Sequence, residues 1–128
     1  MGDGTEIGRV RGLGAAHHGA HHWLLQRFTA IGNLVLGIFL AVSFALLPGY
    51  DYAAVHDWLA KPLPAAAVAL FVVSAFWHAR LGLQVLVEDY VHTPANKFAA
   101  VAALNLLAVG GAGFALFSLI RLALKGAA

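Results

Sequence analysis

The sequence predicts an all-α membrane protein with three transmembrane helices. Of its 128 residues, 61% are hydrophobic and only 11% are charged, and the mean hydropathy is +0.79, which is more apolar than a soluble domain of this length usually is. A helix needs roughly 18 apolar residues or more to cross a bilayer. Three segments meet that requirement: 28–47, 63–76 continuing toward 87, and 98–119.

The first predicted helix covers residues 22–47 and begins a single transmembrane domain, 22–124. Its end is indicated by Pro48-Gly49, a pair that interrupts helices. The apolar run is about 20 residues long, which exceeds the hydrophobic region of a cleavable signal, so we interpret it as a permanent span. The preceding arm, residues 1–21, is rich in glycine and small residues without periodicity, and we expect it to be irregular.

Two proline-containing sequences set the remaining helix boundaries. The connection YDYAAVHDWLAKPLP predicts an interfacial turn with Tyr52 and Trp58 at the level of the lipid headgroups. The second helix is predicted over 64–90, because proline is tolerated in a first turn and Thr93-Pro94 stops the helix. The third helix is predicted over 95–124.

The absence of cysteine excludes disulfides and thiolate metal sites. A metal or cofactor would need histidine, methionine or oxygen ligands, and histidine is abundant, with seven residues. The formal net charge is +2, but no basic cluster is long enough to follow the phosphates of a nucleic acid. We therefore set nucleic acid aside as a partner and expect the lipid bilayer instead.

Basic residues favour one side of the membrane slightly. With three spans, the amino-terminal arm and the connection after the second helix share a side, which carries four basic residues against three on the other. The positive-inside rule then predicts a cytoplasmic amino terminus. The first group is Arg9, Arg11, Arg27 and Lys97, and the second is Lys61, Arg121 and Lys125.

Polar residues recur on one face of the second helix. At about 100° per residue, Asp89 comes within about 20° of His78, roughly 16 Å further along the axis, and Gly82 lies one turn after His78. Histidine followed by glycine at i+4 suits ligation of a flat macrocycle, because the missing side chain lets the ring edge approach the backbone. A structural hydrogen bond from His78 to a neighbouring helix is the alternative interpretation.

The end of this face carries Asp89 and Tyr90. A phenol beside a carboxylate can hydrogen-bond a quinone carbonyl and lie on a proton route. Interfacial anchoring at a helix end explains the same two residues without a ligand.

A second polar stripe, Arg80, Gln84 and Glu88, lies on roughly the opposite side of the same helix. Arginine this far inside a span costs at least a few kcal/mol unless it is paired, and we expect an intrahelical network among the three side chains. Two polar faces leave little of this helix for lipid. The pattern therefore predicts a heteromeric helix bundle larger than three helices, with a second membrane protein in it.

Histidines are concentrated just before the first span, at His17, His18, His21 and His22, with Arg27 slightly inside it. A transition-metal site is disfavoured, because no carboxylate lies nearby and the segment contains glycines. Contact with anionic groups at membrane depth, such as haem propionates, is one interpretation. Snorkelling of Arg27 to lipid phosphate is another.

Two stretches, GLGAAHHGAHHWLLQRFTAI before the first span and FWHARLGLQVLVEDYVH closing the second, carry a resemblance to a known family. Together with three spans in 128 residues, they resemble the smaller hydrophobic membrane anchors of succinate dehydrogenase, respiratory complex II, in bacterial forms related to the mitochondrial enzyme. The pattern that carries the resemblance is a histidine, a glycine four residues later, and Asp-Tyr eleven and twelve residues later.

The resemblance implies roles for individual residues. It implies that His78 is an axial ligand of a haem b iron, with the second ligand coming from the other membrane anchor of the complex. It implies that Tyr90 hydrogen-bonds ubiquinone and that Asp89 lies near the same pocket. The residues that correspond to haem propionate contacts are Arg27 and either His21 or His22, because the doubled histidine leaves the register open.

The function implied is that of a non-catalytic anchor subunit in the bacterial inner (cytoplasmic) membrane. Electrons from succinate would pass through a flavoprotein subunit and an iron-sulfur subunit to ubiquinone, at a site that this chain helps to form. Three alternatives stay open from the residues alone: the anchor of a fumarate-reducing enzyme, a purely structural anchor without haem, and a small transporter. The transporter is disfavoured because no span is broken at its middle.

Overall fold

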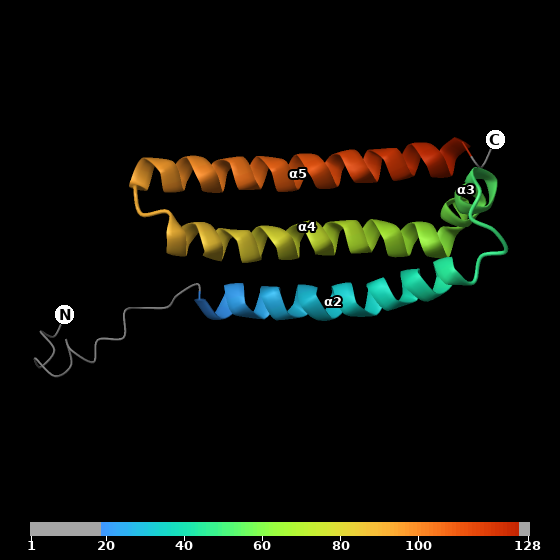
Figure 1. Ribbon diagram of the computed structural model, residues 1–128, viewed down its shortest axis with the longest axis horizontal. Helices are drawn as coiled ribbons and strands as arrows, with labels where there is room; N and C mark the ends of the chain where they lie inside the picture. Colours follow the sequence, from blue (N-terminus) through green and yellow to red (C-terminus); the bar gives the residue numbers. More distant parts are fainter. Residues whose placement is uncertain (1–18, 126–128) are drawn as a thin grey trace, which may run out of the picture.

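Three long helices lie side by side in a single layer in the computed structural model, which describes residues 19–125 (Figure 1). They are α2 (Gly19–Ala45), α4 (Pro62–Tyr90) and α5 (Pro94–Lys125), and a short helix, α3 (Tyr52–Ala60), closes one end. α4 is central and contacts both α2 and α5. Residues 1–18 of the predicted arm lie outside the described residues.

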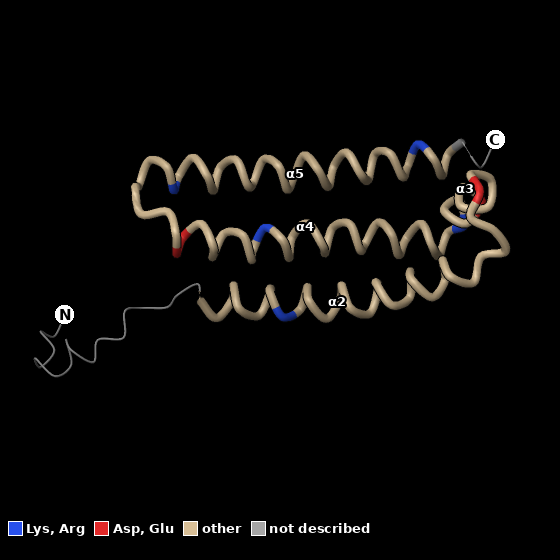
Figure 2. The backbone as a smooth tube through the Cα atoms, in the orientation of Figure 1, with Lys and Arg blue, Asp and Glu red and all other residues tan. Residues whose placement is uncertain are grey.

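The length and composition of these helices confirm the prediction of three helices able to cross a membrane. α4 contains 29 residues and is therefore about 43 Å long, more than the roughly 30 Å of a hydrocarbon core. In the described chain, acidic residues lie only toward the two ends of the layer, whereas basic residues also occur inside α2 and α4 (Figure 2). Arg27 and Arg80 are these inner positions.

The boundary between α4 and α5 is set by backbone chemistry. The Val91 N–H donates to the Val87 carbonyl at 2.9 Å, and Pro94 then restrains the residue before it from helical geometry. Lys97 donates through Nζ to the Glu88 carbonyl at 3.0 Å, which places a positive charge at the negative end of α4. The two helices are thereby fixed at their shared turn.

The other observed ends differ from the predicted ones by up to three residues. α2 begins at Gly19 and ends at Ala45, rather than covering 22–47, and α4 begins at Pro62 rather than Pro64. Both prolines fit the first turn of α4, where their missing N–H groups would have no helical partner.

The segment between the first two spans contains a helix, α3, so the prediction of a turn there is wrong; its placement at the level of the lipid headgroups stays a prediction. The Asp51 side chain accepts a hydrogen bond from the Ala54 N–H at 3.1 Å and so caps the helix. Trp58 is only 8% exposed and its Nε1 donates to Ser43 Oγ of α2 at 2.8 Å. Trp58 therefore attaches α3 to α2, whereas Tyr52 remains exposed.

Very little of the described chain is buried, because a single layer of helices has two open faces. The buried residues are Thr29, Trp58, Pro64, Ala67 and Leu81. Large apolar side chains are exposed along all three long helices. Such surfaces suit lipid and the helices of other membrane proteins rather than water.

Candidate functional site

His78 faces α2, where it contacts Thr29. Its Nδ1 atom lies 3.1 Å from Thr29 Oγ1, and Thr29 is one of the few buried residues, with 9% of its surface exposed. The Thr29 hydroxyl also lies 2.8 Å from the Leu25 carbonyl oxygen. The imidazole is therefore held through Nδ1 by a buried hydroxyl, and Nε2 is the ring nitrogen left for another partner.

The seam between α2 and α4 continues one turn beyond His78 at Gly82. A Cβ atom on Gly82 would lie 3.5 Å from Gln26 Nε2 of α2, so the Gln26 amide covers this glycine. Two buried side-chain oxygens in the described chain have no hydrogen-bond partner, Gln26 Oε1 and Asn33 Oδ1. They flank Thr29 in sequence, and both could accept hydrogen bonds from a group not contained in this chain.

Sequence reasoning missed the α2 side of this site, although a signal was present. Gln26, Thr29 and Asn33 recur at i, i+3 and i+7 in an otherwise apolar run, which places them on one helical face. That face packs on α4, and it carries the hydrogen-bonding groups opposite His78 and Gly82.

Asp89 and Tyr90 lie at the last turn of α4 and are exposed. Tyr90 is 76% exposed. About 16 Å of helix axis separates Asp89 from His78, so the two predicted sites lie at different depths. A quinone pocket at this end would need walls from other subunits.

The amino-terminal end of α2 lies at the same end of the layer as Tyr90 (Figure 1). His22 lines a pocket of about 320 Å³ with Gly19, Gln84, Val85 and Glu88, whereas His21 is exposed. The structure thus separates the two histidines that the doubled sequence leaves equivalent. His17 and His18 lie outside the described residues.

Arg27 lies on a different side of α2 from Thr29. The two positions differ by about 160° around the helix, so Arg27 does not share the α4-facing seam. Its guanidinium carbon lies 4.8 Å from the centroid of the Trp23 ring, a cation–π contact. Arg27 is exposed and therefore accessible to an anionic group from outside this chain.

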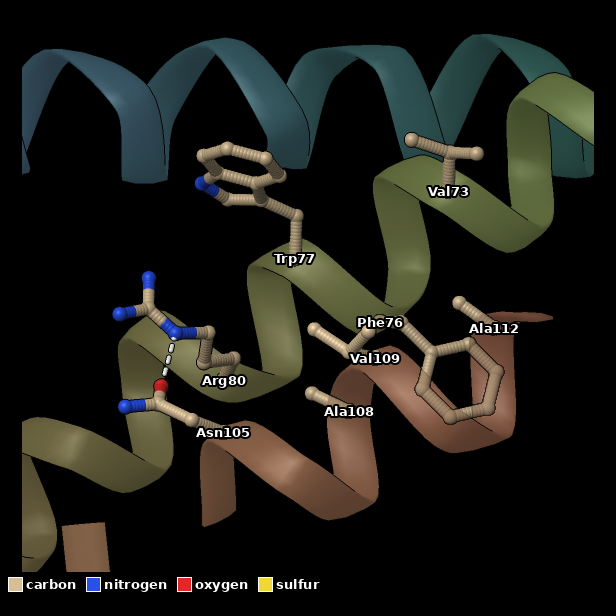
Figure 3. A pocket seen from close by; sticks show the side chains of 8 residues that line it. All are labelled: Val73, Phe76, Trp77, Arg80, Asn105, Ala108, Val109 and Ala112. Atoms are coloured by element: carbon tan, nitrogen blue, oxygen red, sulfur yellow. Dashed lines mark hydrogen bonds between the residues drawn. The ribbon is translucent and has the colours of Figure 1, made fainter. Parts of the chain in front are cut away.

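The predicted network of Arg80, Gln84 and Glu88 is only half correct. Gln84 Nε2 donates to Glu88 Oε1 at 2.8 Å, but Arg80 donates through Nε to Asn105 Oδ1 of α5 (Figure 3). Arg80 and Asn105 lie at one end of a pocket of about 400 Å³ between α4 and α5. Its other walls are apolar: Val73, Phe76, Trp77, Ala108, Val109 and Ala112.

No cluster of three or more histidine, aspartate, glutamate or cysteine side chains that could hold a metal ion occurs between residues 19 and 125. His78 therefore offers a single ligand. A metal bound there would need its other ligands from a cofactor or from a neighbouring protein chain.

Comparison with known proteins gives concordant matches over most of the chain. The family described as "Succinate dehydrogenase/Fumarate reductase transmembrane subunit" matches residues 1–112. The chain is similar to the succinate dehydrogenase hydrophobic membrane anchor subunit of Rickettsia bellii, with 31% identity over 82% of this chain and 84% of the relative. Proteins with the same description from Rickettsia conorii and Paracoccus denitrificans are 36% identical, over 68% of this chain and 70% of the relative, and 29% identical, over 72% and 71%.

Proposed function

The chain belongs to the succinate dehydrogenase/fumarate reductase transmembrane subunit family, and we propose that it supplies one axial ligand of a haem b and part of a ubiquinone-reduction site. This family match confirms the resemblance seen in the sequence. The chain is a multi-pass membrane anchor subunit of succinate dehydrogenase, an oxidoreductase, and associates with the other subunits of that complex. The observation that carries the proposal is the bond between His78 Nδ1 and the buried Thr29 hydroxyl.

The residues around His78 fit a haem. An axial histidine binds iron through one ring nitrogen while the other is hydrogen-bonded, and His78 is held in this way at Nδ1. The partnerless oxygens of Gln26 and Asn33 on the same seam support a group that this chain alone does not contain. When bound, the haem would supply reversible one-electron storage, with its second histidine ligand coming from the other membrane anchor.

The first three turns of α2 would hold the haem propionates. Arg27 presents an exposed guanidinium group, which suits bidentate hydrogen bonds to a carboxylate. His21 and His22 lie less than two turns before it. Of these, His21 is exposed and His22 faces α4, so either could contribute once the other membrane anchor is in place.

Tyr90 and Asp89 would form this chain's part of the ubiquinone site. The Tyr90 phenol would donate a hydrogen bond to a quinone carbonyl oxygen, and this bond strengthens as electrons add negative charge to that oxygen. Reduction to ubiquinol takes two electrons and two protons. The electrons would come from succinate through the flavoprotein and iron-sulfur subunits, and Asp89, which precedes Tyr90 in the sequence, would carry a proton.

The exposed position of Tyr90 supports a site shared between subunits. The other membrane anchor and the iron-sulfur subunit would supply the remaining walls, and that anchor would also complete a larger helix bundle against the open faces of this layer. The amino terminus and the Tyr90 end would face the cytoplasm of a bacterial cell, in agreement with the excess of basic residues there.

The haem assignment is tested by a reduced-minus-oxidised spectrum of the purified complex. The wild-type complex should show a b-type band, and His78→Ala should abolish or perturb it. A b-type spectrum unchanged by this substitution would exclude His78 as a ligand. Complete absence of haem from the wild-type complex would identify a purely structural anchor instead.

The quinone assignment is tested by Tyr90→Phe, with Tyr52→Phe at the opposite end of the layer as the matched control. Tyr52 is 82% exposed and has no proposed ligand. Tyr90→Phe should lower succinate:ubiquinone activity while leaving succinate oxidation by an artificial acceptor intact. Equal loss of both activities, or an equal effect of Tyr52→Phe, would contradict a quinone contact. Faster quinol:fumarate than succinate:quinone turnover would identify the fumarate-reducing alternative.

A further inference from the structure

The Thr29 hydroxyl contacts three groups at the seam between α2 and α4. Oγ1 lies 2.8 Å from the Leu25 carbonyl oxygen, 3.2 Å from the Gln26 carbonyl oxygen and 3.1 Å from His78 Nδ1. A hydroxyl has one proton to donate and two lone pairs to accept with. Carbonyl oxygens only accept, so the nearer of them, on Leu25, takes the proton in the usual back-bond of a helical threonine.

A lone pair of the Thr29 oxygen then faces His78 Nδ1, which must donate. Neutral imidazole carries one N–H, so a proton on Nδ1 leaves the lone pair on Nε2. Metal ligation requires that lone pair. We propose that Thr29 is a positioning residue, which fixes both the ring orientation and the tautomer that make His78 Nε2 a ligand. This inference rests on the proposed role of His78 as a haem ligand.

A second hydrogen bond joins α2 and α4 at the Thr29 backbone and does not involve its hydroxyl. The Thr29 carbonyl accepts a hydrogen bond from Ser74 Oγ at 3.2 Å, so one residue of α2 bonds two positions of α4 that are a turn apart. Gly32 lies beside this bond, and a Cβ there would be in ordinary van der Waals contact with Ser74 Oγ, at 3.4 Å. Thr29 is also β-branched, which restricts its side-chain rotation in a helix. The hydroxyl is therefore held against the imidazole from within α2, by its bond to the Leu25 carbonyl and by this restricted rotation.

The test compares Thr29→Val, which removes the hydroxyl at nearly constant shape, with Thr29→Ser, which keeps it. Ser74→Ala is the matched control, since it breaks a hydrogen bond between the same helices without touching the imidazole. The readouts are haem content, the electron paramagnetic resonance signal of the oxidised haem, and its reduction midpoint potential, all measured on the assembled complex.

Thr29→Val should shift the resonance signal, raise the midpoint potential and weaken haem retention by about 10-fold or more. The midpoint potential should rise because the hydrogen bond at Nδ1 makes the ligand more basic, which favours oxidised iron. Haem retention should weaken because loss of the hydrogen-bond partner of a metal ligand typically costs about 10- to 100-fold in affinity. Thr29→Ser should restore wild-type values and Ser74→Ala should leave them unchanged. If Thr29→Val does not assemble, the smaller Thr29→Ala gives the same comparison.

Wild-type values in Thr29→Val, or an equal shift in Ser74→Ala, would overturn the positioning role. His78→Ala separates this failure from failure of the proposed function. If His78→Ala loses the b-type band while Thr29→Val keeps the wild-type haem content, resonance signal and midpoint potential, only the role of Thr29 is rejected. A band unchanged in His78→Ala would reject the haem assignment itself.

Discussion

Gly111 of α5 lies directly against the ring of Phe76 of α4. A Cβ atom at position 111 would lie 2.5 Å from Phe76 Cε1 and 2.9 Å from Cζ, well inside van der Waals contact. Small residues at helix interfaces let membrane helices approach closely, where dispersion forces rather than the hydrophobic effect provide the attraction. Gly111 therefore sets the spacing between α4 and α5.

Gly111→Ala should weaken the packing of α5 on α4. The added methyl must push the Phe76 ring into a new rotamer or separate the helices, at a cost of about 1–3 kcal/mol. The measurement is the thermal denaturation midpoint of the detergent-solubilised complex, which should fall. Gly110→Ala and Gly113→Ala are matched controls, because, apart from the neighbouring residues and nearby backbone of α5 itself, nothing in the described part of this chain lies within 4 Å of a Cβ at either position. A fall of equal size in all three variants would reject the Phe76 contact as the cause.

Replacing Asn105 should destabilise the complex more than replacing Arg80, its hydrogen-bond partner. Asn105→Leu leaves the guanidinium Nε without its acceptor inside a span, which should destabilise the complex by about 1–3 kcal/mol. Arg80→Leu removes the donor together with its charge and should cost less, since replacing a buried ionic group by an apolar one is often neutral or stabilising. Thermal denaturation of the two single variants and the double variant checks this order. Greater damage from Arg80→Leu would show that the guanidinium has a partner outside this chain.

The Trp58–Ser43 hydrogen bond should couple α3 to α2. Nε1 of the nearly buried indole donates to Ser43 Oγ at 2.8 Å, and we expect a coupling energy of about 0.5–1.5 kcal/mol. A double-mutant cycle with Trp58→Phe and Ser43→Ala isolates this contribution. Purely additive effects would mean that Trp58 contributes by packing against Phe44, whose ring centroid lies 5.7 Å away, and not by the bond.

Asp51 should control the first turn of α3. Its side chain accepts from the Ala54 N–H, and loss of such a cap typically costs about 0.5–2 kcal/mol of helix stability. Asp51→Ala should increase hydrogen exchange at the Ala54 and Val55 amides, whereas Asp51→Asn, which retains an oxygen acceptor, should not. Unchanged exchange in Asp51→Ala would show that packing of Trp58 alone holds the helix.

The three spans and the polar face of α4 could be predicted from the amino-acid sequence alone. Long apolar runs bounded by Pro48-Gly49 and Thr93-Pro94 establish how many helices can cross and where they turn. Regular helix geometry then places His78 and Asp89 on one stripe. Both are local properties, so neither needs knowledge of the neighbouring helices. The family resemblance rested on the same local pattern and was confirmed.

Which side chains meet across the helices became known only from their packing. The structure places Thr29 against His78 and directs Arg80 to Asn105 rather than to Glu88. In a soluble protein the apolar stripe of a helix shows which face packs inward. Here most of the surface of each long helix is apolar, and lipid is as apolar as a neighbouring helix. Hydrophobic patterning therefore cannot select the contacts, and a few hydrogen bonds and glycine-sized gaps make that choice instead.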